Sequence, residues 1–313
     1  MEQLTYRPGD RYFPIPPAEQ GLQTVTAEPF FKITDEKPKH MEGICFDRQG
    51  DMWFVSMYDN CVCKLDMRKK EIVQRVYVDR DVLPTAVKIH KNGRLYICCI
   101  DKVKKGCLYS CEPDGSDIQI ALKGFPIDDM VFDSQGGFYI THFSGTPGEP
   151  DGGVYYIPPD LSEVRPVIKN MASANGVALS TDETVLWTSE WQSQRIMRHV
   201  LSGFRAGSCT VTYQYACGTA GPDSMCIDAD DNLYVAMSDQ GRVLVFNRFG
   251  VPIGQILMPD RDEGKHLFTT CPGVRPGVNE VYIVAADDIT DSGSWIFKAG
   301  SFAPGHGGAY QFQ

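Results

Sequence analysis

The segment "GPDSMCIDADDNLYVAM", residues 221–237, contains the unit on which the fold is built. An apolar stretch is followed by a turn rich in Asp and Asn and then by a second apolar stretch, which predicts a β-hairpin. Asp223 stands where the first strand enters the core, although a buried carboxylate is costly unless a partner compensates its charge. The role of Asp223 therefore depends on whether other parts of the chain carry similar residues at the same place.

The same unit recurs along the sequence. The intervals between copies are 43 to 48 residues and contain further β-rich segments such as "CVCKLDM" and "GRVLVFN". Four short strands in such an interval make one propeller blade. The six copies, of which the last is degenerate, begin at Glu42, Thr85, Asp128, Asn175, Asp223 and Thr269.

The repeats predict an all-β fold, a six-bladed β-propeller formed by residues 1–313 as a single domain. Residues 1–23 are expected to pack on the outside as an N-terminal extension, and the tail "GAYQFQ" is expected to close the ring with N-terminal residues. A β-sandwich is the alternative fold, but it does not require so even a period.

The first position of each copy carries an oxygen-bearing side chain. Because the innermost strands of a propeller surround its channel, Glu42, Asp128, Asn175 and Asp223 are expected to point at one axis. Three carboxylates brought together in this way repel one another. A hard divalent cation removes the repulsion, since it prefers carboxylate and amide oxygens. We therefore predict that these four residues bind a metal ion in the central channel, Ca²⁺ or another divalent cation such as Zn²⁺, Mg²⁺ or Mn²⁺.

Other acidic residues fit structural roles. A single Asp or Asn before a strand usually belongs to a turn. Asp228, Asp230 and Asn232 resemble an EF-hand loop, but Leu233 occupies the position that requires glycine. We interpret these three residues as parts of a hairpin turn. The sequence also lacks the nucleophile elbow, the H-E-x-x-H helix, the P-loop and the dinucleotide-binding motif.

Composition excludes several classes of partner. The formal net charge of −10 disfavours nucleic acid binding. No apolar run reaches the length of a membrane span, and the N-terminal residues lack the pattern of a signal peptide. We expect a cytoplasmic protein without a membrane or nucleic acid partner. The eleven cysteines lie mostly in apolar segments, as is typical of reduced, structural thiols.

The blocks "EGICFD", "DDMVFDSQGGFYIT", "NGVALSTDE" and "GPDSMCIDADDNLYVAM" resemble the family of gluconolactonase, senescence marker protein and luciferin-regenerating enzyme. The resemblance extends from about residue 24 to the C-terminus. It implies a six-bladed propeller, a calcium or other divalent ion in the channel, and hydrolysis of lactones. It also implies that Glu42, Asp128, Asn175 and Asp223 are metal ligands, and that Asp223 transfers a proton.

The sequence departs from the family at two places. A bacterial lactonase of the family holds a second calcium ion after the second repeat, where this chain has Lys104 and Lys105. We therefore expect one ion. His142 stands where that lactonase has an acidic residue. We expect His142 to line the substrate site weakly, together with Tyr58, Trp191 and Ser224.

The leading functional hypothesis is a metal-dependent lactonase acting on a small lactone or ester. The cation polarises the carbonyl, water attacks, and Asp223 carries a proton to the leaving ring oxygen. Two alternatives stay open, because a fold does not determine a reaction. One is phosphotriester hydrolysis or isomerisation at the same site, and the other is a propeller that binds without catalysis. The substrate and the oligomeric state are not determined by the sequence.

Overall fold

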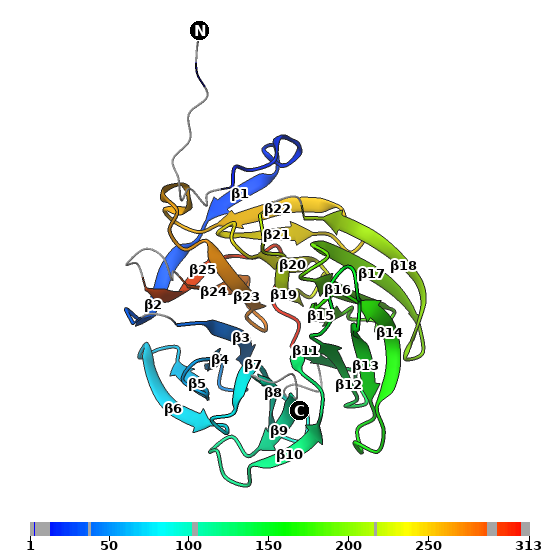
Figure 1. The fold of residues 1–313 in the computed structure, drawn as a ribbon. Helices are drawn as coiled ribbons and strands as arrows, with labels where there is room; N and C mark the ends of the chain where they lie inside the picture. The colour runs from blue at the N-terminus through cyan, green and yellow to red at the C-terminus, as the bar shows by residue number, and fades with distance from the viewer. Residues whose placement is uncertain are drawn as a thin grey trace.

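The computed structural model describes residues 3, 13–36, 39–101, 106–215, 218–286 and 293–307. Its strands form six sheets arranged in a ring around a central axis, as Figure 1 shows. This confirms the predicted six-bladed β-propeller. Lys104, Lys105 and the tail 308–313 lie outside the described residues, so the predictions that depend on them stay predictions.

Each blade is an antiparallel sheet whose four main strands follow one another from the axis outward. The innermost strands are β3 (Met41–Phe46), β7 (Val82–Ile89), β11 (Ile127–Phe132), β15 (Ala174–Leu179), β19 (Pro222–Ile227) and β23 (Phe268–Val274). The second strands are β4 (Met52–Ser56), β8 (Leu95–Asp101), β12 (Phe138–His142), β16 (Val185–Glu190), β20 (Leu233–Met237) and β24 (Glu280–Ala286).

The outer half of each blade completes the sheet. The third strands are β5 (Cys61–Asp66), β9 (Cys107–Cys111), β13 (Gly152–Ile157), β17 (Arg195–Ser202), β21 (Arg242–Phe246) and β25 (Ser294–Gly300). The outer strands are β6 (Glu71–Tyr77), β10 (Gln119–Lys123), β14 (Arg165–Met171), β18 (Arg205–Gln214), β22 (Pro252–Leu257) and β2 (Glu28–Thr34). Two short 3₁₀ turns, η1 (Pro17–Glu19) and η2 (Arg261–Glu263), are the helices of the described chain, and neither is long and apolar enough to cross a bilayer.

Burial changes from the axis to the rim. Every residue of β3 is buried, whereas residues of β6 alternate largely between exposed and half-buried. Inner strands are covered on both faces by neighbouring blades, so they are mostly apolar apart from the polar residues near their beginnings and Lys88, and outer strands keep one polar face. The core consists of wedges between blades; for example, Trp53 of blade 1 and Ile97 of blade 2 belong to one apolar cluster.

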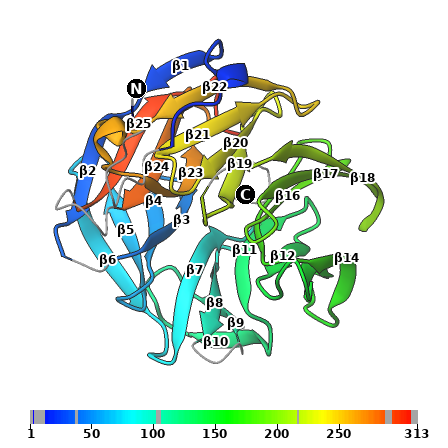
Figure 2. The same ribbon diagram turned by 45° about the horizontal axis from the view of Figure 1, so that its top comes forward.

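N-terminal residues close the ring. Strand β2 pairs antiparallel with β25 and is the outer strand of blade 6. The neighbouring strand β1 (Gln23–Thr26) adds to blade 5 by pairing parallel with β22. Figures 1 and 2 show both pairs side by side. The ring is therefore closed by pairing between β2 and residues 294–300 of β25.

A β-bulge interrupts every innermost strand near its beginning. In each blade, two residues of the first strand face a single residue of the second, which bends the strand and redirects side chains. The register shifts fall between Glu42 and Ile44, Pro84 and Ala86, Ile127 and Met130, Ala174 and Val177, Pro222 and Met225, and Thr269 and Cys271.

The bulge in β23 shows that the sixth copy of the repeat begins one residue later than the sequence alignment places it. In the register, Thr270 occupies the level of Glu42 and Thr85, not Thr269. The hydroxyls of Thr85 and Thr270 make equivalent contacts, because they donate to the carbonyls of Ile127 (2.8 Å) and Met41 (2.7 Å) in the next blade. The hydroxyl of Thr269 instead donates to the carbonyls of Met237 and Arg242. Thr85 and Thr270 thus connect neighbouring blades.

Candidate metal centre

Glu42, Asp128, Asn175 and Asp223 occupy one level of the channel. They lie at the bulges of β3, β11, β15 and β19, in blades 1, 3, 4 and 5. None of the four is more than 8% exposed. Inner strands of neighbouring blades contact one another around the ring, so the four residues share one level of adjacent strands. That their side chains bind one ion stays a prediction.

The three carboxyl groups share an environment that disfavours charge. Burial raises the pKa of Asp128 well above its ordinary range, and the charges of Glu42 and Asp223 raise it further. Burial and the charge of Asp129 raise the pKa of Glu42 in the same way. Burial and Glu42 raise the pKa of Asp223, while a hydrogen bond with the Asn175 side chain opposes the shift. Each acid therefore needs a positive partner to stay ionised.

Two oxygens at this level lack a partner within the described residues. They are Oε2 of Glu42 and Oδ1 of Asn175, both buried. Over the same residues, no three His, Cys, Asp or Glu side chains lie close enough together to form a metal-binding group. Buried oxygens without hydrogen bonds are unusual in folded proteins. Three carboxylates and one amide, two of which have an unpaired oxygen, have the oxygen chemistry that a hard divalent cation prefers.

Short hydrogen bonds fix the candidate ligands. The N–H of Ser224 donates to Oδ1 of Asp223 over 3.1 Å. Ser189 accepts a hydrogen bond from the N–H of Gly176 (2.7 Å) and donates to the carbonyl of Asp223 (2.9 Å), which joins blade 4 to blade 5. A Cβ at Gly176 would lie 2.6 Å from the Asp223 carbonyl oxygen, so only glycine allows this approach.

His40 contacts Glu42, and the repeat analysis did not identify it. Its Nε2 lies 2.7 Å from Oε1 of Glu42. Its ring packs edge-on against Phe268 and Tyr58, at centroid distances of 4.7 and 6.0 Å. This pairing leaves the second oxygen of Glu42 for a cation. His40 precedes the strand, outside the repeat columns, so spacing could not reveal it.

The weaker candidates have separate local surroundings, and their role in binding a substrate stays a prediction. Tyr58 is half exposed, and its ring packs against His40, which in turn contacts Glu42. Trp191 bonds through its backbone to Ser173 and Gln194. Ser224 is buried beside Asp223. His142 ends β12 and packs against Phe125 and Tyr155, and burial lowers its pKa.

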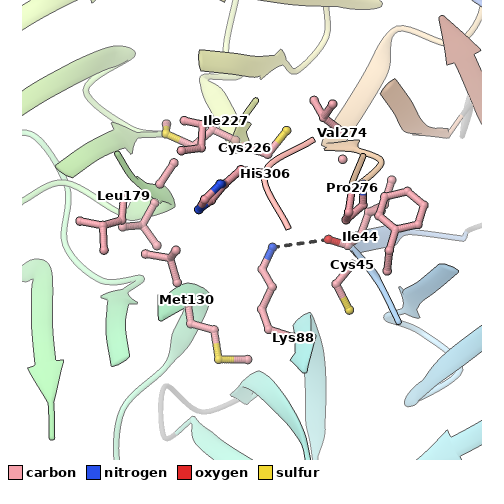
Figure 3. A pocket seen from close by; sticks show the side chains of 16 residues that line it. Ile44, Cys45, Lys88, Met130, Leu179, Cys226, Ile227, Val274, Pro276 and His306 are labelled. Carbon is pink, nitrogen blue, oxygen red and sulfur yellow. Dashed lines mark hydrogen bonds between the residues drawn. The ribbon is translucent and has the colours of Figure 1, made fainter. Parts of the chain in front are cut away.

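Two charged residues missed by the sequence analysis lie next to the centre. Asp129, only 2% exposed, occupies the same bulge as Asp128. Lys88 extends from β7 into the channel, as Figure 3 shows. Burial raises the pKa of Asp129, and Lys88 and a hydrogen bond from Ser224 oppose that shift. Comparing the second and fourth positions of the repeats, and not only the first, would have identified both residues.

Comparison with models of known protein families gives one match for this chain. The family model of the SMP-30/Gluconolactonase/LRE-like region matches residues 42–286. The chain belongs to this family. Its membership confirms the resemblance seen in the sequence, and the matched region begins at Glu42.

Curated relatives extend the match over nearly the whole chain. Lactonase drp35 of Staphylococcus aureus (strain MRSA252) is 46% identical over 305 residues, which are 95% of this chain and 93% of that protein. Lactonase drp35 of Staphylococcus saprophyticus is 44% identical over 319 residues and covers 99% of this chain and 97% of that protein.

Solved structures share the fold at low identity. A luciferin-regenerating enzyme superposes with a TM-score of 0.73 at 19% identity, over 90% of this chain and 99% of that chain. The calcium-binding protein regucalcin from Agrobacterium tumefaciens superposes with a TM-score of 0.72 at 15% identity, over 93% and 97% of the two chains.

Proposed function

We propose that the protein is a divalent-metal-dependent lactonase that hydrolyses a small lactone or ester. The observation that carries the proposal is the level of four buried oxygen donors, Glu42, Asp128, Asn175 and Asp223, two of which have an unpaired oxygen. Relatives that are 44% and 46% identical over nearly the whole chain carry the name lactonase. Calcium is the proposed native ion, because the donor set is made only of oxygen.

The chain supplies distinct groups for the reaction. A cation held by these four residues would polarise the lactone carbonyl and stabilise the negative charge that develops on its oxygen. Glu42, Asp128 and Asn175 would hold the ion. Asp223 would also accept a proton from the attacking water and return it to the ring oxygen that leaves. The N–H of Ser224 holds one oxygen of this carboxylate in place.

A substrate panel with controlled metal content tests the proposal. Five- and six-membered lactones, sugar lactones, aryl esters and a phosphotriester are assayed after exhaustive chelation and after addition of Ca²⁺, Mg²⁺, Mn²⁺ or Zn²⁺. We expect metal-dependent ring opening of at least one lactone class, and its absence from Asp223→Asn. Lactone hydrolysis that survives chelation contradicts the metal centre, and phosphotriester turnover alone favours the alternative reaction.

A further inference from the structure

A histidine side chain contacts one of the proposed metal ligands. Nε2 of His40 lies 2.7 Å from Oε1 of Glu42, whereas Oε2 of Glu42 is buried without a hydrogen-bond partner among the described residues. An ionised carboxylate only accepts hydrogen bonds, so the Nε2–H of His40 is the donor. Hydrogen bonds to a charged acceptor are short, as this distance is. The two oxygens of Glu42 are therefore not equivalent.

Packing from two other segments fixes the imidazole of His40. Its ring meets Phe268 of β23 edge-on at a centroid distance of 4.7 Å, and Tyr58 in the turn after β4 at 6.0 Å. Aromatic rings favour such edge-to-face contacts. The N–H of Met57 donates to the His40 carbonyl over 2.9 Å, which ties the backbone to blade 1. These contacts preorganise the ring to donate to Glu42.

The propeller repeat does not require a histidine at this place. The sixth copy is counted here from Thr270. Two residues before the first position, the six copies carry His40, Leu83, Pro126, Ser173, Gly221 and Phe268. Aliphatic, small and aromatic residues thus occupy the same place in the other blades. The contact with Glu42 distinguishes His40 from these residues, so its role belongs to that carboxylate.

A carboxylate can bind a cation in two ways. Calcium accepts carboxylates through one oxygen or through both. At Glu42, the hydrogen bond from His40 competes with a cation for Oε1, while Oε2 is unpaired. Residues that contact a ligand from behind orient it toward the metal. Binding through Oε2 alone takes one coordination position, and the position that Oε1 does not take stays open to water or to a substrate oxygen.

We propose that His40 is a positioning residue that reserves Oε1 of Glu42, so that this carboxylate binds the channel cation through Oε2 alone and leaves one coordination position open for the reaction. The inference rests on the proposed metal centre and deepens it. Replacing a residue with a purely structural role weakens calcium binding. Releasing the reserved oxygen predicts the opposite, which is tighter binding of calcium together with slower turnover.

Calcium affinity and turnover of His40 variants test this inference. His40→Phe keeps a flat ring between Phe268 and Tyr58 but removes the N–H donor. We expect it to bind calcium at least about threefold more tightly. Its kcat at saturating calcium should fall about tenfold or more on the lactone that the wild type hydrolyses. His40→Gln carries an amide N–H in place of Nε2 and should restore both values toward the wild type. Calorimetric titration and steady-state kinetics measure them.

Terbium luminescence provides a readout that does not depend on activity. Decay rates of bound Tb³⁺ in H₂O and in D₂O give the number of water molecules on the ion. We expect His40→Phe to hold about one water fewer than the wild type, because both oxygens of Glu42 then bind. His40→Gln should keep the wild-type number.

His306→Phe is the matched control. His306 is also half-buried, but it lines the cavity of Figure 3 with Leu179 and Ile227, at the ends of β15 and β19. The proposed ligands lie near the beginnings of these strands, so the same substitution at His306 is remote from Glu42. It should leave the calcium affinity and the water count unchanged.

The outcomes separate this inference from the proposed function. A wild-type chain that binds neither calcium nor terbium overturns the metal centre itself. If the wild type binds both ions, weaker calcium binding by His40→Phe or an unchanged water count overturns only the role of His40. His40→Leu, with the residue that blade 2 carries as Leu83, is a second variant without a donor. It should behave as His40→Phe does, and it decides the question if the phenylalanine variant does not fold.

Discussion

At the scale of single residues, the first position of the repeat gives the four proposed donors, and neighbouring positions complete their surroundings. Asp223 combines two contacts that a plain turn residue would not need: burial beside Glu42 and an N–H from Ser224 on one oxygen. Glu42 has a different environment, since His40 occupies one of its oxygens. The two acids can therefore be distinguished by experiment.

Asp223→Asn and Glu42→Gln make the same chemical change at these two acids. Each keeps an oxygen donor but loses charge and basicity. If Asp223 also transfers a proton, saturating calcium should restore much of the activity of Glu42→Gln but little of that of Asp223→Asn. The residual loss of turnover in Asp223→Asn should be on the order of 10²–10⁴-fold. Equal rescue of both variants by high calcium would show that Asp223 is a ligand only.

Sequence patterns predicted these acids because strand and turn lengths fix which residues share a level. They did not predict that Lys88 and Asp129 lie on the inner strands, since lysine and aspartate are usually surface residues. The sixth copy was misaligned by one residue for a related reason. A bulge adds one residue to a strand without changing its apolar pattern, so Thr269 and Thr270 cannot be distinguished by periodicity.

At the scale of strands, close contact between inner strands depends on residues without side chains at the bulges. We predict that Gly176→Ala lowers stability by about 1–3 kcal/mol, because its Cβ would lie 2.6 Å from the Asp223 carbonyl oxygen and 2.9 Å from Cα of Ser224. It should also weaken calcium binding by shifting Asp223. Denaturant unfolding and calcium titration measure both effects.

Gly207→Ala is the matched control for that change. Gly207 lies on outer strand β18, and a Cβ there would meet only the Val200 carbonyl at 3.5 Å, an ordinary contact distance. Its stability and calcium affinity should stay near the wild-type values. Equal stability losses in the two variants would mean that the close approach of β15 to β19 does not require glycine at position 176.

Strand β17 carries a buried histidine whose titration should make the free energy of unfolding depend on pH. His199 is 1% exposed, and its Nε2 lies 3.0 Å from the hydroxyl of Thr188 on β16. Burial and the charge of Arg195 lower its pKa from 6.5 to about 4. The unfolded chain therefore binds a proton at a higher pH than the folded chain. This contribution to stability is complete above pH 6.5 and is lost as the pH falls toward 4.

The loss attributable to His199 should reach about 3 kcal/mol near pH 4. Urea unfolding from pH 4 to pH 8 of the wild type and of His199→Gln measures it, because the difference between the two curves cancels the other titrating groups. We expect the difference in unfolding free energy to change with pH only below pH 6.5. A constant difference across the range would show that the histidine is not buried in its neutral form.

At the scale of the whole molecule, the proposed site takes residues from four blades, so a bound ion should stabilise the entire ring. A ligand that binds only the folded state adds about 2.7 kcal/mol when its concentration is 100 times its dissociation constant. Chelation should therefore lower the Tm and abolish lactone hydrolysis, and added calcium should restore both. Calorimetry with and without chelator measures the shift, and Glu42→Gln should show a smaller one. An unchanged Tm together with unchanged activity would contradict a structural and catalytic ion.

The way the ring closes imposes an order of events on synthesis. Strand β2 leaves the ribosome before any blade is complete, yet its partner β25 is among the last strands made; the pair Glu28 and Lys298 is 270 residues apart. At translation rates of about 5–20 residues per second, β2 waits roughly a quarter of a minute to a minute for that partner. Its sequence, EPFFKIT, carries a proline and two charges beside its aromatic residues. Such residues hinder pairing between exposed strand edges, so β2 is protected from self-association while the nascent chain is unfinished.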